Sequence, residues 1–294
     1  MADSRSVSRR AFLHAGAAGL AAAALARSAP AAETEAQALT FGVFTDPHYA
    51  DREPAGTRHY RDSDAKLDEF VKAMGEAKPA FAICLGDLVD KGKTVAEELG
   101  YLKHIDAVYR KLACPRHYVL GNHDLATLTK AQFREATGMP AAHYAFDAGP
   151  LHCIVLDANY TKDFTPYGAG NFRWTDTWLS PDELKWLAAD LKQTERKTLI
   201  FLHQCLDDDK GAHGVKNCRD VRQILEASGK VIAVLNGHNH RGGHREINGI
   251  PYHTLRAMVE GPGLDHNAYA LVAVTPAGSL TIKGFGTQPS FPRE

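Results

Sequence analysis

Short apolar runs alternate with segments of helical periodicity through the first third of the chain. Leu39–Thr45 and Ala80–Leu85 predict buried strands, and the apolar residues of Asp64–Ala77 recur at helical spacing. Val95–Leu112 predicts a second helix and Arg116–Leu120 a third strand. Strands that alternate with helices in this order favour a mostly parallel sheet covered by helices.

The second half continues the same theme with more strands. A hairpin is expected over His143–Asp147 and Leu151–Asp157, because Ala148-Gly149-Pro150 separates two strand-like runs. Ser180-Pro181-Asp182-Glu183 is a capping box that opens a helix to about Gln193. The remaining predicted elements are strands at Lys197–His203 and Val231–Asn236, a helix at Asp220–Ala227, and further strands to Phe285. The pattern predicts an α/β fold in one domain, residues 39–294, preceded by a linker at 32–38.

The first 31 residues have the pattern of a bacterial twin-arginine export signal. Ser8-Arg9-Arg10-Ala11-Phe12-Leu13 precedes an Ala/Gly/Leu stretch, Ala15–Ala26, and the small-residue site Ala29-Pro30-Ala31. The alternative is an N-terminal membrane anchor, but this stretch is too short to span about 30 Å of hydrocarbon. We expect the twin-arginine machinery to export the precursor, leaving a periplasmic or secreted protein with no transmembrane segment.

The net charge argues against a nucleic-acid-binding protein, and the cysteine content allows at most a few disulfides. Removing residues 1–31 takes away four arginines and one aspartate and leaves a formal charge of -4. Such a chain has no basic field for a nucleic-acid platform, so a local charge such as a metal must attract an anionic substrate. There are five cysteines and no CxxC pair. An oxidising compartment would permit a disulfide, for which Cys205 and Cys218 are candidates.

Polar motifs follow five of the predicted strands, at their carboxyl ends. They are Asp46-Pro47-His48, Gly86-Asp87-Leu88-Val89-Asp90, Gly121-Asn122-His123-Asp124, His203 and Gly237-His238-Asn239-His240. In an open α/β sheet these ends meet at one crevice. Carboxylate, imidazole and amide ligands without thiolate suit Mn, Fe or Zn. These groups outnumber the ligands of one ion and favour two ions about 3.5–4 Å apart, with Asp87 as the candidate bridge.

These motifs resemble the signature of the calcineurin-like metallophosphoesterase superfamily: D-x-H, G-D-x-x-D, G-N-H-[DE], a strand-end His and G-H-x-H. The resemblance implies a four-layer αββα sandwich of two β-sheets flanked by helices, with two metals at one edge. It would assign the first metal to Asp46, His48, Asp87 and His240, and the second to Asp87, Asn122, His203 and His238. It also implies that a metal-activated hydroxide attacks phosphorus. His123 would face the substrate phosphate as a catalytic group, with Asp124 orienting its ring.

A narrower resemblance is to the manganese-dependent ADP-ribose/CDP-alcohol diphosphatases. It rests on Phe41–Asp46 with Tyr49-Ala50-Asp51, on Arg58-His59-Tyr60-Arg61, on Leu179–Leu187 and on Gly237–Gly243. It implies a phosphohydrolase that cleaves phosphodiester or diphosphate bonds of a nucleotide-type substrate. A phosphomonoesterase and a binding protein that has lost catalysis are the alternatives.

Other residues have less specific patterns. Arg241 and His266 are candidate substrate contacts. Five loop aromatics, Tyr160, Phe164, Tyr167, Phe172 and Trp174, could stack on a nucleobase or pack against the domain. His213 and Asp207–Asp209 form a polar loop that either covers the site or is simply solvated.

Overall fold

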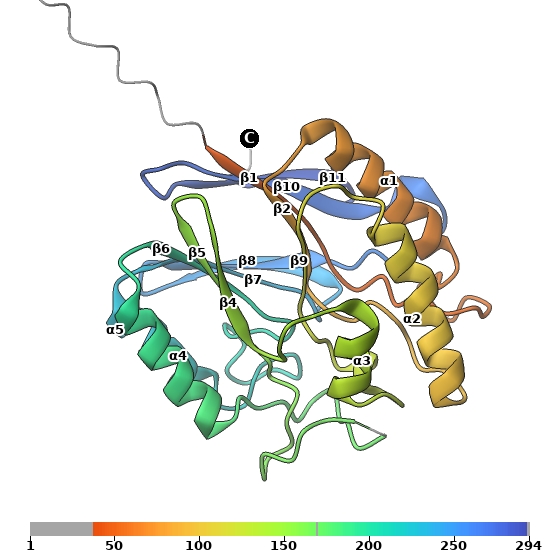
Figure 1. Ribbon diagram of the computed structural model, residues 1–294, viewed down its shortest axis with the longest axis horizontal. Coiled ribbons are helices and arrows are strands. Elements are labelled where there is room, and N and C mark those ends of the chain that lie inside the picture. The colour runs from red at the N-terminus through yellow and green to blue at the C-terminus, as the bar shows by residue number, and fades with distance from the viewer. Residues whose placement is uncertain (1–37, 169, 293–294) are drawn as a thin grey trace, which may run out of the picture. The chain divides into compact units, whose positions relative to one another are not determined.

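Eleven strands form two sheets in the part of the chain that the computed structural model describes, residues 38–168 and 170–292 (Figure 1). The five-stranded sheet has the order β11 (Leu280–Gly286), β10 (Ala268–Val274), β1 (Leu39–Phe44), β2 (Phe81–Cys84), β3 (Arg116–Tyr118). The six-stranded sheet has the order β4 (Tyr144–Ala148), β5 (Leu151–Val155), β6 (Lys197–Phe201), β7 (Val231–Asn236), β9 (Ile250–Arg256), β8 (Arg241–Ile247).

The first sheet takes its parallel core from the predicted β-α-β-α-β segment. Strands β1, β2 and β3 are parallel, as predicted, and β10 and β11 extend the sheet in antiparallel fashion. Alternate residues of β1 face opposite layers. Phe41 packs edge-on against Phe201 of the other sheet, with ring centroids 5.7 Å apart, while Phe44 packs on Phe70 of α1 (Asp62–Ala77) at 4.7 Å. Together with α2 (Val95–Tyr109), α1 therefore covers the outer face.

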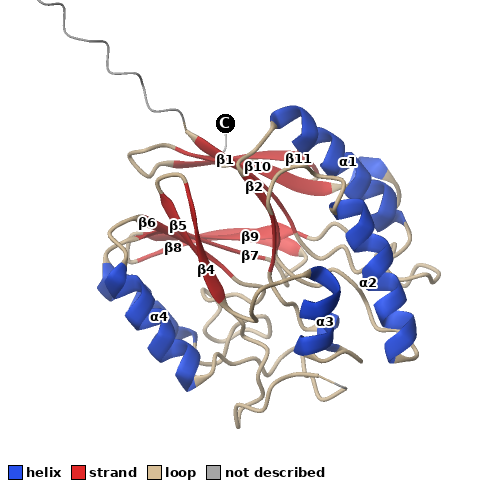
Figure 2. Cartoon of the chain, viewed as in Figure 1, coloured by secondary structure: helices blue, strands red, loops and turns tan. Residues whose placement is uncertain are grey.

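The second sheet shows the same alternation. In β6, Leu199 and Phe201 belong to the core between the sheets, while Ile200 packs with the outer helices α4 (Pro181–Gln193) and α5 (Cys218–Ser228). Strands β5, β6, β7 and β9 run parallel, and β4–β5 is the expected hairpin. The predicted fold class is confirmed: two mixed sheets lie between outer helices (Figure 2).

A third helix near the site, α3 (Lys130–Thr137), was not predicted. The residues that begin and end it can nevertheless be recognised in the sequence. Thr129 and Gln132 form a capping box, and Gly138 ends the helix in the left-handed conformation at φ 78°. The helix is only 8 residues long, and its apolar face contributes little beyond Phe133, so periodicity gave no signal.

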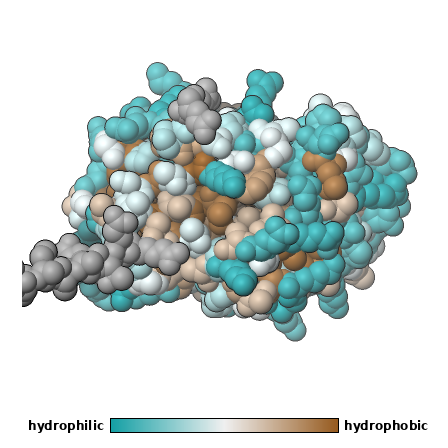
Figure 3. All heavy atoms as spheres, turned by 90° about the horizontal axis from the view of Figure 1, so that it is seen from above, coloured by the Kyte–Doolittle hydropathy of each residue, from teal (hydrophilic) through white to brown (hydrophobic). Residues whose placement is uncertain are grey.

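Several other expectations meet the structure here. The predicted export signal and all of the linker except Ala38 lie outside the described residues. The disulfide is not formed, since all five cysteines are free. Within the described ranges no helix has both the length and the apolar character to cross a membrane. The face shown in Figure 3 mixes hydrophilic side chains with smaller hydrophobic areas, which is ordinary for a folded surface.

Candidate metal centre

The loops that follow five strands meet at one edge of the sandwich. The five-stranded sheet supplies Asp46 and His48 after β1, Asp87 after β2, and Asn122 and His123 after β3. The six-stranded sheet supplies His203 after β6, and His238 and His240 after β7. The loops are also tied together: the amide of Asp46 donates to the carbonyl of Gly86 at 3.0 Å, and that of Gly237 to His203 at 3.0 Å.

At two glycines of the motifs, neighbouring loops come so close that no side chain would fit. A Cβ atom on Gly121 would lie 2.2 Å from Oδ1 of Asp87, and one on Gly237 would lie 1.9 Å from Oγ1 of Thr45. Any larger residue would push the carboxylate or its neighbour out of place. These glycines therefore let loops from different strands touch.

Four of the predicted ligand residues occupy left-handed backbone although none is glycine. Their φ values are 53° for Asp46, 46° for His48, 51° for Asp87 and 68° for His238. Side chains other than glycine reach this region at a free-energy cost, and such residues gather at functional sites. The loops are thus bent to aim these side chains at one place.

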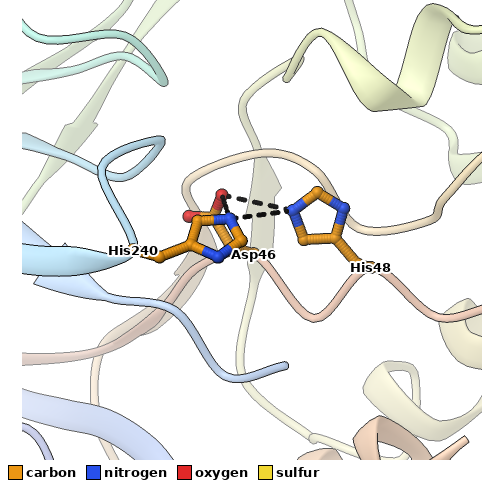
Figure 4. Close-up of side chains that lie close together, drawn as sticks. All are labelled: Asp46, His48 and His240. Carbon is orange, nitrogen blue, oxygen red and sulfur yellow. Dashed lines mark hydrogen bonds and ion pairs between the residues drawn. The ribbon is translucent and has the colours of Figure 1, made fainter. Parts of the chain in front are cut away.

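The first cluster contains Asp46, His48 and His240 (Figure 4). Oδ1 of Asp46 lies 3.5 Å from Nε2 of His48 and 3.3 Å from Nε2 of His240. The two Nε2 atoms are 3.2 Å apart. Three potential ligand atoms from two sheets therefore converge on one small volume.

The second cluster contains Asp87, His203 and His238, with Asn122 beside them in the same cleft. Nε2 of His203 lies 3.1 Å from Oδ2 of Asp87 and 3.2 Å from Nδ1 of His238. Oδ2 of Asp87 is also 3.5 Å from Nε2 of His48 in the first cluster. Asp87 therefore stands between the clusters, where a bridging ligand would be.

Unpaired polar atoms show that the clusters fit cations. Oδ1 of Asp46, both side-chain polar atoms of Asn122, and Nε2 of His238 are buried without a hydrogen-bond partner. Leaving buried polar atoms unpaired costs about 1–3 kcal/mol each. A cation between the side chains would satisfy the oxygen atoms and would also separate the closely spaced imidazole nitrogens. The donor set of oxygen and imidazole nitrogen suits Mn, Fe or Zn.

The electrostatics of the protein alone point the same way. Burial by itself would lower the pKa of His48 and His203, but nearby carboxylates, Asp87 first, raise the values to about 10 and about 9. Burial and the charge of His203 instead lower the pKa of His238 to about 3. In the protein alone, two imidazolium protons therefore offset the carboxylate charge of Asp46 and Asp87, and metal cations would replace those protons.

Two further carboxylates hold ligand histidines in place. Oδ2 of Asp90 lies 3.1 Å from Nδ1 of His48, and Oε1 of Glu260 lies 2.6 Å from Nδ1 of His240. Each contact leaves Nε2 as the nitrogen for a metal, and such partners raise ligand basicity. Asp90 belongs to a recognised motif but had no predicted role, and Glu260 was missed because no motif surrounds it.

A buried lysine fixes the segment that carries Glu260. Nζ of Lys66, on α1, donates to the carbonyl oxygens of Met258, Glu260 and Gly261 at 2.8, 3.0 and 2.8 Å. Lys66 is fully buried, so these three bonds are its compensation for leaving water. It is a positioning residue for Glu260 and, through it, for His240.

The predicted pairing of Asp124 with the ring of His123 is corrected by the structure. Oδ1 and Oδ2 of Asp124 accept hydrogen bonds from the amides of Val89 and Gly121, at 3.1 and 2.9 Å. The carboxylate beside the ring is Asp90, whose Oδ1 is 3.3 Å from Nδ1 of His123. Asp124 is next to His123 in sequence, but the short helix His123–Leu125 turns it into the interior, where it fixes two loops.

A cleft of about 670 Å³ opens over the clusters. Its lining includes Arg241, the candidate substrate contact, together with His123, Arg58, Trp174 and His213. His266 does not line this cleft. It lies in a neighbouring one of about 690 Å³ that shares His240 and Arg241 with the first, and its Nδ1 is 2.8 Å from the carbonyl oxygen of Pro262.

The structure shows where the polar loop around His213 and the five loop aromatics lie. His213 faces the cleft, and its ring centroid is 5.4 Å from that of His238. Asp209 instead pairs with Arg219 and Arg222 of α5, so this loop is tied to the helix rather than solvated throughout. Of the five loop aromatics, Trp174 lines the cleft, and Tyr167 is buried.

This fold and site define a class of protein. Residues 39–242 match the model of the calcineurin-like phosphoesterase family, and the chain belongs to that family. It is therefore a metal-dependent phosphoester hydrolase.

Its relatives carry more specific names. The chain is 24% identical to a manganese-dependent ADP-ribose/CDP-alcohol diphosphatase of Oryza sativa subsp. japonica, over 83% of this chain and 90% of the relative. It is also 24% identical to a protein of the same name from Xenopus tropicalis, over 76% and 85%. Among solved structures, a dimetal phosphatase from Danio rerio superposes with a TM-score of 0.72 at 20% identity, over 85% of this chain and 96% of the other. Purple acid phosphatase from yellow lupin seeds gives 0.60 at 11%, over 86% and 53%.

Proposed function

We propose that this chain hydrolyses the diphosphate bond of nucleoside-diphosphate-linked compounds with the help of two metal ions. The observation that carries the proposal is the pair of clusters joined by Asp87, beneath a cleft lined by Arg58 and Arg241. Two cationic side chains over a metal site suit a substrate with two linked phosphates. The names of the relatives from Oryza and Xenopus support the same substrate class.

The ligand assignment follows from the clusters. Asp46, His48 and His240 with Asp87 would hold one ion, and His203, His238 and Asn122 with Asp87 the other. Ions bound there lower the pKa of a water to near neutrality and offset negative charge on the phosphoryl oxygens. Manganese is our proposal for the identity, because the relatives are named as manganese-dependent.

His123 acts on the leaving group in this proposal. Its ring lines the cleft, and with Nδ1 turned to Asp90, Nε2 is the nitrogen available to substrate. The pKa of Asp90 is held far below its usual range: burial would raise it, but hydrogen bonds from His123 and His48 and their charges outweigh burial. An ionised Asp90 fixes the ring orientation, so that Nε2 faces the cleft and can donate a proton to the departing phosphate oxygen.

The test is turnover of ADP-ribose, bis-p-nitrophenyl phosphate and p-nitrophenyl phosphate by protein loaded with Mn²⁺. We expect the diphosphate to be cleaved with the highest kcat/KM. Preference for p-nitrophenyl phosphate would favour the phosphomonoesterase alternative, and no turnover of any of the three would contradict both. His123→Ala should lower kcat by about 10²–10⁴-fold with metal content unchanged, whereas loss of metal would refute its assigned role.

We also propose that the precursor is exported by the twin-arginine machinery and works in the periplasm or outside the cell. The support is the sequence Ser8-Arg9-Arg10-Ala11-Phe12-Leu13 with the apolar stretch behind it. Replacing Arg9 and Arg10 by lysine should leave the protein in the cytoplasmic fraction of a bacterial host. Unchanged export of that variant would contradict the proposal.

A further inference from the structure

Trp174 is an exposed aromatic ring at the edge of the metal cleft. Four large apolar side chains are exposed in the described ranges, namely Val95, Phe164, Trp174 and Leu264, and of these Trp174 lines this cleft. Its side chain is 45% exposed. Its ring centroid is 5.5 Å from that of His213 and 6.1 Å from that of His238. When another aromatic ring covers a flat apolar ring that is exposed to water, the free energy of the system falls.

The backbone around Trp174 is built to present it. The hydroxyl of Tyr167, a buried side chain, lies 2.8 Å from the carbonyl oxygen of Arg173 and 2.7 Å from that of Asp176. The amide of Asp176 also donates to the carbonyl of Arg173 at 2.8 Å, which closes a turn around Trp174. The turn is therefore anchored to the domain while its aromatic side chain remains outside the core. Such a preformed arrangement reduces the entropy lost when a ligand binds.

The cleft is lined by both aromatic and cationic side chains. The rings of Trp174 and His213, 5.5 Å apart, form what we call the aromatic wall, and Arg58 and Arg241 supply positive charge to the same cleft. Asp87, Asn122 and His238 lie in the same cleft. An aromatic surface suits a base because every nucleobase has a π-face, and arginines suit phosphate. In a nucleotide these two groups are one sugar apart.

We infer that the aromatic wall is the subsite for the nucleobase of the substrate, which stacks on Trp174. This inference rests on the proposed function and deepens it, because it makes the base a determinant of substrate affinity. Stacking tolerates any base, so the subsite selects nucleosides as a class without choosing strongly between adenine and cytosine. The base is remote from the phosphoryl group that reacts, so its contact acts on binding in ground state and transition state alike.

A matched pair of substrates tests the inference. ADP-ribose and bis(ribos-5-yl) diphosphate contain the same diphosphate bond between two ribose 5-positions, and the second has no base. In the Mn²⁺-loaded full chain, Trp174→Ala should raise KM for ADP-ribose by about tenfold and leave kcat nearly unchanged. KM for the base-free compound should not change, and Trp174→Phe should keep most of the affinity. Trp186→Phe, on α4 outside the cleft, is the control.

The possible failures can be told apart. If the unaltered protein cleaves neither compound, the proposed function fails. If it cleaves ADP-ribose and Trp174→Ala changes neither KM, or changes both equally, the nucleobase subsite is overturned while the proposed function stands. Retained turnover of the base-free compound also shows that the variant is folded.

A binding measurement removes the dependence on turnover. AMP added to the metal-free full chain should quench tryptophan fluorescence through Trp174, and ribose 5-phosphate should not. The quench should persist in Trp186→Phe and disappear in Trp174→Ala. An equal quench in Trp174→Ala would overturn the inference.

Discussion

The two sheets contribute different chemistry to the centre. From β1, β2 and β3, the five-stranded sheet supplies both carboxylates and the amide, together with His48. The six-stranded sheet supplies imidazoles alone, from the ends of β6 and β7. Yet neither cluster belongs to one sheet: the first takes His240 from the second sheet, and the second takes Asp87 from the first. The centre is complete only when the sheets are packed together.

We expect the largest loss of metal binding and turnover from replacing Asp87, the carboxylate that serves both clusters. Asp87→Asn removes the negative charge between His48 and His203, so both ions should bind poorly. We expect kcat to fall by about 10³-fold or more. Steady-state turnover with metal analysis checks this, and Asp182→Asn, at an exposed position of α4, is the control. Full metal content with a small loss of turnover would contradict a bridging role.

The contact between sheets can be broken without replacing a ligand residue. Gly237→Ala, after β7, would drive a Cβ atom into Thr45 and towards Oδ2 of Asp46, at 1.9 and 2.5 Å. We expect it to reduce the free energy of unfolding by about 2–4 kcal/mol, since neither backbone nor ligand can give way freely.

Urea unfolding measures that loss, with Gly243→Ala as the matched control. Gly243 lies on exposed β8, and a Cβ atom there would meet nothing within 4 Å. We expect the control to change stability by less than about 0.5 kcal/mol. Similar values for the two variants would mean that the close approach is unimportant.

Glu260 sharpens the comparison because it acts on the imidazole of one cluster. Glu260→Gln weakens the contact to Nδ1 of His240, so the first cluster should lose metal affinity by about 10–100-fold while the second is spared. Titration with Mn²⁺ followed by calorimetry would then show one weakened site and one unchanged site. Glu246→Gln, on exposed β8, is the control. Equal weakening of both sites would show that the clusters do not bind independently.

The pH dependence of stability tests the same centre without any substitution. His48 and His203 have pKa values of about 10 and about 9 in the folded, metal-free protein, above the unfolded value of 6.5. Their protonation therefore stabilises the fold fully below pH 6.5, and that contribution is lost as pH rises through 9 and 10.

The urea midpoint of metal-free protein should thus fall between pH 6.5 and 7, a window in which the buried Lys66, with a pKa of about 8, is still largely charged. Protein saturated with Mn²⁺ should show a flatter profile, because its imidazoles are no longer protonated. Equal slopes with and without metal would contradict this account.

The sequence predicted those features of the fold and the site that follow from local patterns of apolar and polar residues. Strand ends were recognisable because apolar runs stop abruptly at polar motifs, and all seven predicted ligand residues meet at one edge of the fold. The contacts that were missed or misassigned depend on how the chain folds in three dimensions, which the order of residues does not show directly. Glu260 contacts His240 from a loop that is held by Lys66, 194 positions earlier in the chain. Asp124 was misassigned because adjacency along a chain says nothing about which way a turn directs a side chain.

The left-handed backbone at Asp46, His48, Asp87 and His238 has a consequence for adaptation. Each such residue costs of order 1–3 kcal/mol, and four together approach the whole net stability of a typical domain, about 5–15 kcal/mol. Glycine at these positions would relieve the cost and remove the side chain. Selection for heat resistance and selection for turnover therefore pull in opposite directions at the same four residues, and a thermostable descendant would have to gain its stability elsewhere in the sandwich.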